Sequence, residues 1–331
     1  MRSSALDPSH HAMSLSNTAL LTLCALSLPA LARAQDATVP SAQFPTIQSA
    51  VLNATDADNS GTIHIRVDAG TYNENLRISR SNLRLEGDPA NPPTIQGDGT
   101  VQVVWVETLT SGFLDNVTLD NLRVTGGGLL NDGVELSRVN NATVRNVEAF
   151  GNAEGIHWNR GTGGALRDSL ARDNAHSGIK LTNVFDGTVT NNLGRDNGSN
   201  GIDITGSANL VVESNDCHHN TDNGLRMRRT TGSAARNNVL HENVNEGARL
   251  ESVTALQFTG NTCSMNQENG IRSRNTFDCT FSQNTLSNNT KFGVRRRQWS
   301  GDDWDAVAGG DQDPAGDNNF AGNGSGAVRN D

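Results

Sequence analysis

The chain has 331 residues, with 26 lysines and arginines against 36 aspartates and glutamates, and its formal net charge is −10 at pH 7. Hydrophobic residues make up 34% and aromatic residues 4%, which is too little for a polytopic membrane protein. The acidic balance argues against a general nucleic-acid-binding protein.

The beginning of the chain, residues 1–34, predicts an export signal. Leu20–Leu31 is an apolar run that is too short to span a bilayer, and it ends in an A-x-A cleavage pattern at Ala32-Arg33-Ala34. A buried core helix is the alternative reading of the run. The region before it is weakly basic because it holds only Arg2, so Met13 is an alternative start. We expect a secreted or periplasmic protein without a membrane anchor.

The next segment, residues 35–61, predicts a capping helix. Pro45 suits the first turn of that helix. The apolar residues that recur here at helical spacing are Phe44, Ile47, Ala50, Val51 and Ala54. Such a helix would cover the first exposed edge of a sheet, where unpaired backbone invites aggregation. Regular strands are expected to begin near Thr62, within Ile63–Val67.

The central segment, residues 62–298, contains an internal repeat. A glycine followed by a small or branched apolar residue recurs with one step of 22 residues and six steps of 23, at Gly133, Gly155, Gly178, Gly201, Gly224, Gly247, Gly270 and Gly293. The residue after each glycine and the residue two positions later alternate as in a strand with both side chains facing inward. A strand pattern at this period indicates a solenoid.

Asparagine recurs at two fixed places in the repeat. Four residues before the glycine stand Asn174, Asn197, Asn220, Asn243, Asn266 and Asn289, and nine before it stand Asn192, Asn215, Asn238, Asn261 and Asn284. Asparagine tolerates a left-handed backbone in turns, and stacked asparagines can bond along a ladder. Helical repeats would need leucine and alanine at helical spacing, which the sequence lacks. We therefore predict an all-β parallel β-helix of about ten coils.

The repeat at residues 201–212, Gly-Ile-Asp-Ile-Thr-Gly-Ser-Ala-Asn-Leu-Val-Val, followed by Asn215, resembles the right-handed β-helix repeat of the pectin-lyase-like superfamily. The resemblance covers residues 44–298 and implies a right-handed parallel β-helix. In many members the substrate groove lies over the strand that matches this Gly-Ile-x-Ile segment. Pectate lyases, alginate lyases, mannuronan C-5 epimerases, polygalacturonases and non-catalytic surface proteins share the repeat. The Asp-Pro-His motif of the epimerases and the paired Asp and Gly-His-Gly motifs of the polygalacturonases are not found, so the subfamily stays open.

Between the two inward residues of each coil lies an outward position that is ionisable in every coil from residue 133 onward. This ionisable row consists of Glu135, His157, Lys180, Asp203, Arg226, Arg249, Arg272 and Arg295. Its last four members, the arginine row, would stand on one line about 4.8 Å apart. They are either solvated surface charges or ligands for the carboxylates of an anionic polysaccharide, whose sugar spacing is comparable to the coil step. We predict the second. Nucleic acid is discounted because aromatic platforms between the arginines are missing.

The N-terminal half of the ionisable row predicts proton-transfer chemistry. In β-elimination of a uronate, a cation neutralises the carboxylate, a base removes the C5 proton and an acid protonates the leaving oxygen. Lys180 or His157 is the candidate base, and Arg226 is the candidate cation. The resemblance to lyases of this fold, which often use a lysine or arginine base, implies such roles for Lys180 and Arg226. The predicted substrate-binding residues are Asn159, Arg228, Arg249, Arg272 and Arg295.

Glu135 and Asp203 are candidate ligands for calcium, which prefers several oxygen ligands, although two carboxylates on separate coils are too few alone. Elsewhere, His218 and His241 occupy equivalent outward places on adjacent coils, with His219 and Glu242 alongside. They are either exposed turn histidines or ligands of a transition metal.

These patterns together predict an exported, monomeric protein that acts on an acidic polysaccharide and uses no nucleic acid or membrane partner. The function that the sequence favours is that of a polysaccharide lyase of the alginate or pectate kind. The alternatives are a uronate epimerase or glycoside hydrolase of the same fold, or a non-catalytic binding or surface-structural protein. The coils of residues 133–298 carry almost no insertions, which counts against a deep active site. Residues 299–331 are expected to be irregular, with a last partial coil near Asn318-Asn319-Phe320.

Overall fold

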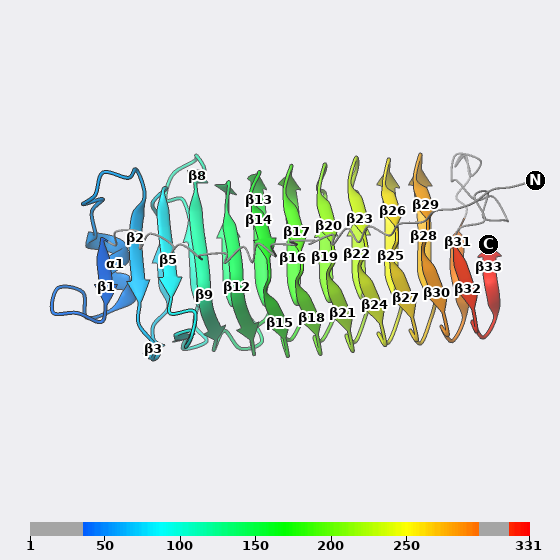
Figure 1. The fold of residues 1–331 in the computed structure, drawn as a ribbon, viewed down its shortest axis with the longest axis horizontal. Coiled ribbons are helices and arrows are strands. Elements are labelled where there is room, and N and C mark those ends of the chain that lie inside the picture. Colours follow the sequence, from blue (N-terminus) through cyan, green and yellow to red (C-terminus); the bar gives the residue numbers. More distant parts are fainter. Residues whose placement is uncertain (1–35, 298–317) are drawn as a thin grey trace, which may run out of the picture. The chain divides into compact units, whose positions relative to one another are not determined.

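The computed structural model describes residues 36–297 and 318–331, and the predicted export signal lies outside the described residues. The described chain winds into a parallel β-helix whose strands stack side by side in sequence order (Figure 1). This confirms the predicted fold class. None of the described helices is both long enough and apolar enough to cross a membrane.

The described strands form three faces, and the strands within each face run parallel to one another. The first sheet has 11 strands: β4 (Leu76–Ile78), β7 (Val104–Glu107), β10 (Val134–Ser137), β13 (Ile156–Thr162), β16 (Ile179–Phe185), β19 (Ile202–Thr205), β22 (Leu225–Arg228), β25 (Ala248–Thr254), β28 (Ile271–Phe277), β31 (Phe292–Arg297) and β33 (Gly326–Asn330). The strands of the glycine repeat therefore lie together on one face, as predicted.

The other two faces belong to one 20-stranded sheet and are called here the second and third sheets. Two long strands, β9 (Val117–Thr125) and β12 (Thr143–Phe150), turn the corner between them. The second sheet also holds β1 (Ala37–Val39), β2 (Ile63–Val67), β5 (Leu83–Gly87), β14 (Ala165–Arg167), β17 (Thr188–Thr190), β20 (Val211–Glu213), β23 (Ala234–Arg236), β26 (Gln257–Thr259) and β29 (Thr280–Ser282). The third holds β3 (Thr71–Asn73), β6 (Thr94–Gln96), β15 (Leu170–Arg172), β18 (Leu193–Arg195), β21 (Asp216–His218), β24 (Val239–His241), β27 (Thr262–Ser264), β30 (Thr285–Ser287) and β32 (Asn319–Ala321). A small pair, β8 (Leu114–Asp115) and β11 (Val139–Asn140), lies apart from them.

The core is a stack of inward side chains in register from coil to coil. Ile202 pairs with Ile179 on one side and with Leu225 on the other, and all three are buried. Burying each such side chain stabilises the fold by about 1.5–3 kcal/mol relative to leaving it exposed. Because a coil packs only against its neighbours, the register of these pairs fixes where every outward side chain of the first sheet stands.

The repeat glycine is required by close approach of the next coil. A Cβ atom added to Gly201 would lie 2.7 Å from the Cβ atom of Cys217 and 2.8 Å from the carbonyl oxygen of Gly224. Real Cβ atoms essentially never come so close to other heavy atoms. The repeat glycine therefore marks the point in each coil where the backbone packs closely against the neighbouring coil.

Both predicted asparagine ladders are present and buried. The side chain of Asn220 donates to Asn243 Oδ1 (3.0 Å) and to the carbonyl of Gly194 (2.9 Å), and its own Oδ1 accepts from the backbone and side chain of Asn197. The left-handed backbone falls on the residue before each ladder asparagine, such as His219 before Asn220, and not on the asparagine itself. That detail of the prediction was wrong, because the asparagine side chain must point inward to join the ladder.

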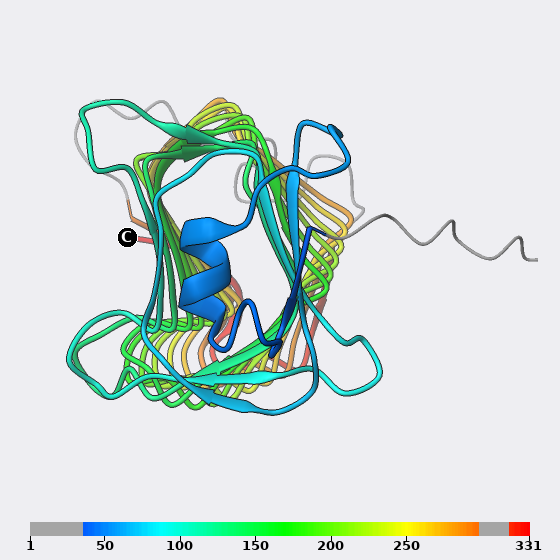
Figure 2. The same ribbon diagram turned by 90° about the vertical axis from the view of Figure 1, so that its left-hand side faces the viewer.

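The N-terminal end of the solenoid is covered by α1 (Ile47–Asn53), which lies across the first coil (Figure 2). Thr46 is its N-cap, so Pro45 precedes the helix and does not lie in the first turn, where it was predicted. The carboxylate of Glu74 accepts from the first two helical amides, at 2.9 Å each, and Arg80 donates to carbonyls at the other end. At the opposite end, β32 and β33 pair with β30 and β31.

Candidate functional site

The ionisable row stands in register along the outward face of the first sheet. Its members pair one to one through successive strands in the order Glu135, His157, Lys180, Asp203, Arg226, Arg249, Arg272 and Arg295. Neighbours in the row are therefore about 4.8 Å apart along the stack. Asn159 and Arg228 lie in the next outward row. This alignment is as predicted.

His157 is held by a carboxylate from the preceding coil. Its Nδ1 atom lies 3.0 Å from Oδ2 of Asp132, and its Nε2 atom lies 3.4 Å from the hydroxyl of Thr182. The side chain of His157 is 14% exposed. When Asp132 accepts the Nδ1 proton, Nε2 carries the lone pair and can take a proton from a substrate lying on the sheet.

Lys180 is paired with a buried carboxylate and remains a cation. Its Nζ atom donates to Oε1 of Glu154 at 2.8 Å, and the other oxygen of Glu154 accepts from the amide of Ser177 at 2.7 Å. Burial acts to lower the pKa of Lys180, but the hydrogen bond and charge of Glu154 outweigh it, so the pKa is raised above its ordinary value. This favours Lys180 as a neutralising cation over its predicted alternative role as the base.

Asp203 and Glu135 are carboxyl groups that hold their protons more tightly than usual. Burial raises the pKa of Asp203, and the charges of Arg226 and Lys180 offset this only in part. Burial likewise raises the pKa of Glu135, which accepts a hydrogen bond from Gln102 at 2.8 Å. Both carboxyl groups are therefore suited to donate a proton at higher pH than an exposed carboxyl group.

The predicted calcium pair, Glu135 and Asp203, is not brought together. The two residues stand three coils apart in the row, about 14 Å, which is too far for one ion. Among the described residues, neither belongs to a group of three or more side chains whose ligand atoms lie close enough to share a metal.

The arginine row shares its charge with carboxylates on the same face. Arg249 donates to Glu251 at 2.7 Å, and Arg226 lies 3.8 Å from the other oxygen of that carboxylate. Although burial alone would raise the pKa of Glu251, the hydrogen bond and charge of Arg249 hold it below its ordinary value. The two remaining arginines also face carboxylates, Arg272 that of Glu246 and Arg295 that of Asp331.

A hollow of about 200 Å³ lies beside the arginine row. It is lined by Arg228, Arg229, Glu251, Ser252, Arg274 and Asn275. The Nε atoms of Arg228 and Arg226 are buried and have no hydrogen-bond partner among the described residues. The side chains of Arg226 and Arg228 are nevertheless partly exposed as a whole, and guanidinium groups at the surface of a sheet suit the oxygens of a bound carboxylate or sulfate.

Sequence reasoning missed several residues that shape this face. The position directly before the repeat glycine holds Asp132, Glu154, Ser177, Asn200, Asn223, Glu246 and Asn269. Comparing this position from coil to coil would have revealed the carboxylates that pair with His157, Lys180 and Arg272. Trp105 continues the row beyond Glu135, with the guanidinium of Arg77 5.3 Å from its ring centre. Its coil has Val103 in place of the glycine, so a search for the glycine repeat passes over it.

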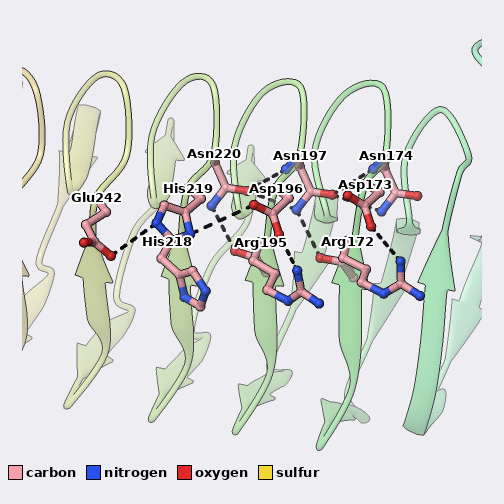
Figure 3. Close-up of polar contacts among 12 residues, drawn as sticks. Arg172, Asp173, Asn174, Arg195, Asp196, Asn197, His218, His219, Asn220 and Glu242 are labelled. Carbon is pink, nitrogen blue, oxygen red and sulfur yellow. Dashed lines mark hydrogen bonds and ion pairs between the residues drawn. The ribbon is translucent and has the colours of Figure 1, made fainter.

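A second groove, of about 580 Å³, runs over the turns that follow the third sheet (Figure 3). Its lining includes the carboxylates of Asp173 and Asp196, each paired with the arginine before it, Arg172 or Arg195. Each of these carboxylates is matched by one arginine, whereas on the first sheet the arginine row together with Arg228 and Arg274 outnumbers the carboxylates paired with it. The groove is therefore a poorer surface for a polyanion than the first sheet.

The family model described as "Right handed beta helix region" matches residues 106–209 and 186–302, which together make up more than half of the chain. The chain belongs to this family of right-handed β-helix proteins. No curated protein matches the sequence.

Several solved structures share the fold. The A-module of mannuronan C-5 epimerase AlgE4 from Azotobacter vinelandii aligns with a TM-score of 0.71 at 17% identity over 86% of this chain and 92% of that chain. The A-module of AlgE6 from the same organism aligns at 0.64 and 18% identity, over 86% and 90% of the two chains. The periplasmic alginate epimerase AlgG aligns at 0.63 and 16% identity, over 90% and 81%. At such identities the likeness establishes the fold.

Proposed function

We propose that the protein binds an anionic polysaccharide of the polyuronate class along the outward face of the first sheet and abstracts the C5 proton of one uronate. The observation that carries this proposal is the pairing of His157 with Asp132 directly beside the charged Lys180, in line with the arginine row. The spacing of one coil matches the spacing of one sugar, so successive carboxylates meet successive coils.

The reacting sugar lies over His157 and Lys180. Lys180, held by Glu154, neutralises the sugar carboxylate and so stabilises the charge that develops when the C5 proton leaves. His157 Nε2 accepts that proton, and Asp132 stabilises the resulting imidazolium. Glu135, next to His157 in the row, is the nearest carboxyl group with a raised pKa and serves as the proton donor.

Arg226 takes a different role from the one predicted. It stands three coils from His157, about 14 Å, and is too distant to neutralise the carboxylate of the sugar that His157 deprotonates. We assign it to the neighbouring sugars. The other residues assigned to substrate binding are Asn159, Arg228, Arg249, Arg272 and Arg295.

After proton abstraction the reaction has two outcomes. If the C4–oxygen bond breaks and the leaving oxygen is protonated, the product is an unsaturated uronate and the enzyme is a lyase. If a proton returns to C5 from the opposite face, the product is the epimer. The names of the AlgE4, AlgE6 and AlgG neighbours support alginate as the polymer and epimerisation as the outcome, in place of the lyase that leads from sequence alone.

We also propose export, with residues 1–34 as the signal and the β-helix as the secreted or periplasmic protein. The name of the periplasmic AlgG neighbour supports this location. A non-catalytic binding protein is the second candidate, because the strands from β13 to β30 are joined by short connections that build low walls.

The experiment is to incubate the full chain with alginate, pectate and glycosaminoglycans, with and without calcium. Absorbance in the unsaturated-uronate band reports elimination, and proton NMR of the sugars reports epimerisation. Binding without either product would select the non-catalytic candidate, and the absence of binding to every polymer would overturn the proposal.

A further inference from the structure

A cluster of imidazoles and carboxylates on the third sheet takes no part in the proposed polysaccharide site. Strands β21 and β24 pair in parallel so that His218 and His241 stand side by side. Asp216 lies two residues before His218 and therefore shares its outward face. The two imidazole rings are 4.7 Å apart between centres and are tilted by 31°.

Three donor atoms converge in this cluster. Oδ1 of Asp216 lies 2.9 Å from Nδ1 of His218 and 3.3 Å from Nε2 of His241. The three residues offer one ligand atom each within 4.8 Å of one another. Ligands placed 2.0–2.1 Å from a tetrahedral zinc ion are separated by about 3.3 Å, so the cluster closely matches the spacing of three ligands on one ion.

A second carboxylate orients the imidazole of His241. Oε2 of Glu242 lies 3.0 Å from Nδ1 of His241. The same oxygen lies 3.3 Å from Nε2 of His219, and His219 in turn faces Asp196, as Figure 3 shows. When Glu242 accepts the Nδ1 proton, the lone pair on Nε2 faces the carboxylate of Asp216. Two acceptors 3.3 Å apart are satisfied by a cation between them, and a carboxylate behind the liganding histidine is the usual support for such a site.

The surroundings leave this cation position open. Arg195 precedes His218 in the sheet register, but its guanidinium is paired with Asp196. Ser264 follows His241 on the other side. The side chains of His218 and His241 are 18% and 21% exposed and that of Asp216 is 46% exposed, so a fourth position faces solvent.

We propose that Asp216, His218 and His241 bind a divalent transition-metal ion of the zinc type, with Glu242 as the residue that positions His241. Two imidazoles and one carboxylate suit zinc, copper or nickel, whereas calcium prefers a shell of oxygens. The bound ion would join two adjacent coils, and it would therefore stabilise the folded chain against unfolding. The site is separate from the first sheet, so it does not rest on the proposed function.

The test is to titrate the full chain, carrying no histidine tag, with zinc and separately with calcium, reading stoichiometry by calorimetry and stability by thermal unfolding. We expect one zinc per chain, a higher melting temperature with zinc, and no such effect of calcium. His218→Ala and His241→Ala should each abolish this binding, whereas His176→Ala, which removes an exposed histidine elsewhere, should retain it. Glu242→Gln should weaken zinc binding by about 10–100-fold.

Two results would overturn the proposal. Equal zinc stoichiometry in the wild-type chain and in the double variant His218→Ala/His241→Ala would place the metal elsewhere. Absence of zinc binding to a wild-type chain that melts cooperatively would mean that the three residues form a hydrogen-bonded cluster alone. An unchanged affinity in Glu242→Gln would remove the positioning role assigned to that residue.

Discussion

Oδ2 of Asp132 lies 3.0 Å from Nδ1 of His157, so a carboxylate from one coil orients the imidazole of the next. The neighbouring lysine is arranged in a similar way, since Glu154 of the coil before it binds Lys180. One pair provides a proton acceptor and the other provides a fixed positive charge. Side by side, the two pairs form the part of the first sheet best suited to remove a proton next to a carboxylate.

Asp132→Asn should lower turnover of the polyuronate by about 10²–10⁴-fold, because the amide no longer fixes the tautomer of His157 or stabilises its protonated form. Polymer binding should change little, since the arginine row is intact. Asp222→Asn, which makes the same change in the turn of a distant coil, is the control. Steady-state rates for both variants check the prediction, and equal rates would contradict it.

As the pH rises, the free energy of unfolding of the Asp203→Asn variant should increase relative to that of the wild-type chain. Burial raises the pKa of Asp203, so the folded chain holds this proton more tightly than the unfolded chain. The stabilisation from the protonated carboxyl group is complete below the ordinary value of 3.8 and is lost as the pH rises through the raised value. Asparagine cannot ionise and escapes that loss.

Urea unfolding of wild-type and Asp203→Asn chains between about pH 4 and about pH 7 measures this difference. Asp186→Asn, at an exposed turn, is the matched control. A difference in unfolding free energy that stays constant over this range would contradict the assigned pKa direction.

Arg226→Ala combined with Arg249→Ala should weaken polyuronate binding and flatten its dependence on salt, because fewer ion contacts remain to be screened. The control removes two arginines from the second sheet, Arg167→Ala with Arg236→Ala, and so changes the net charge equally. Binding isotherms at several salt concentrations distinguish the two faces. Equal losses in both double variants would show that net charge alone governs binding.

Asn220→Ala should lower the free energy of unfolding by about 3 kcal/mol, because it leaves buried donors and acceptors on two neighbouring coils without partners. Asn209→Gly, which removes an asparagine side chain from an exposed left-handed turn, is the control. Denaturant unfolding compares the two. If Asn220→Ala cost no more than the control, the ladder would not be a main source of stability.

Much of the fold could be read from sequence because the repeat constrains it. Gly201 and its equivalents mark where one coil touches the next, and Ile202 with Ile204 marks the inward face. Once that register is known, every outward residue of the first sheet is placed. The turn conformation was harder, since the left-handed residue before each ladder asparagine varies from Asp196 to His219 and has no common side chain.

The candidate site was only half predictable. Periodicity places His157 and Lys180 on adjacent coils, but their partners Asp132 and Glu154 come from turns, where the side-chain direction does not follow from alternation. The sign of the pKa shift of Lys180 depended on that unseen carboxylate.

The central claim is tested most directly by hydrogen exchange at C5 of a polyuronate in deuterated water. NMR or mass spectrometry would count the deuterium that enters at C5 when a proton returns there, and absorbance in the unsaturated-uronate band would report elimination, which leaves no hydrogen at C5. We predict deuterium at C5 or unsaturated product with the wild-type chain and with His176→Gln, and a loss of about 10²-fold or more in both readouts with His157→Gln, while all three bind the polymer. Undiminished exchange or elimination in His157→Gln, or neither deuterium at C5 nor unsaturated product from a wild-type chain that binds the polymer, would contradict the account.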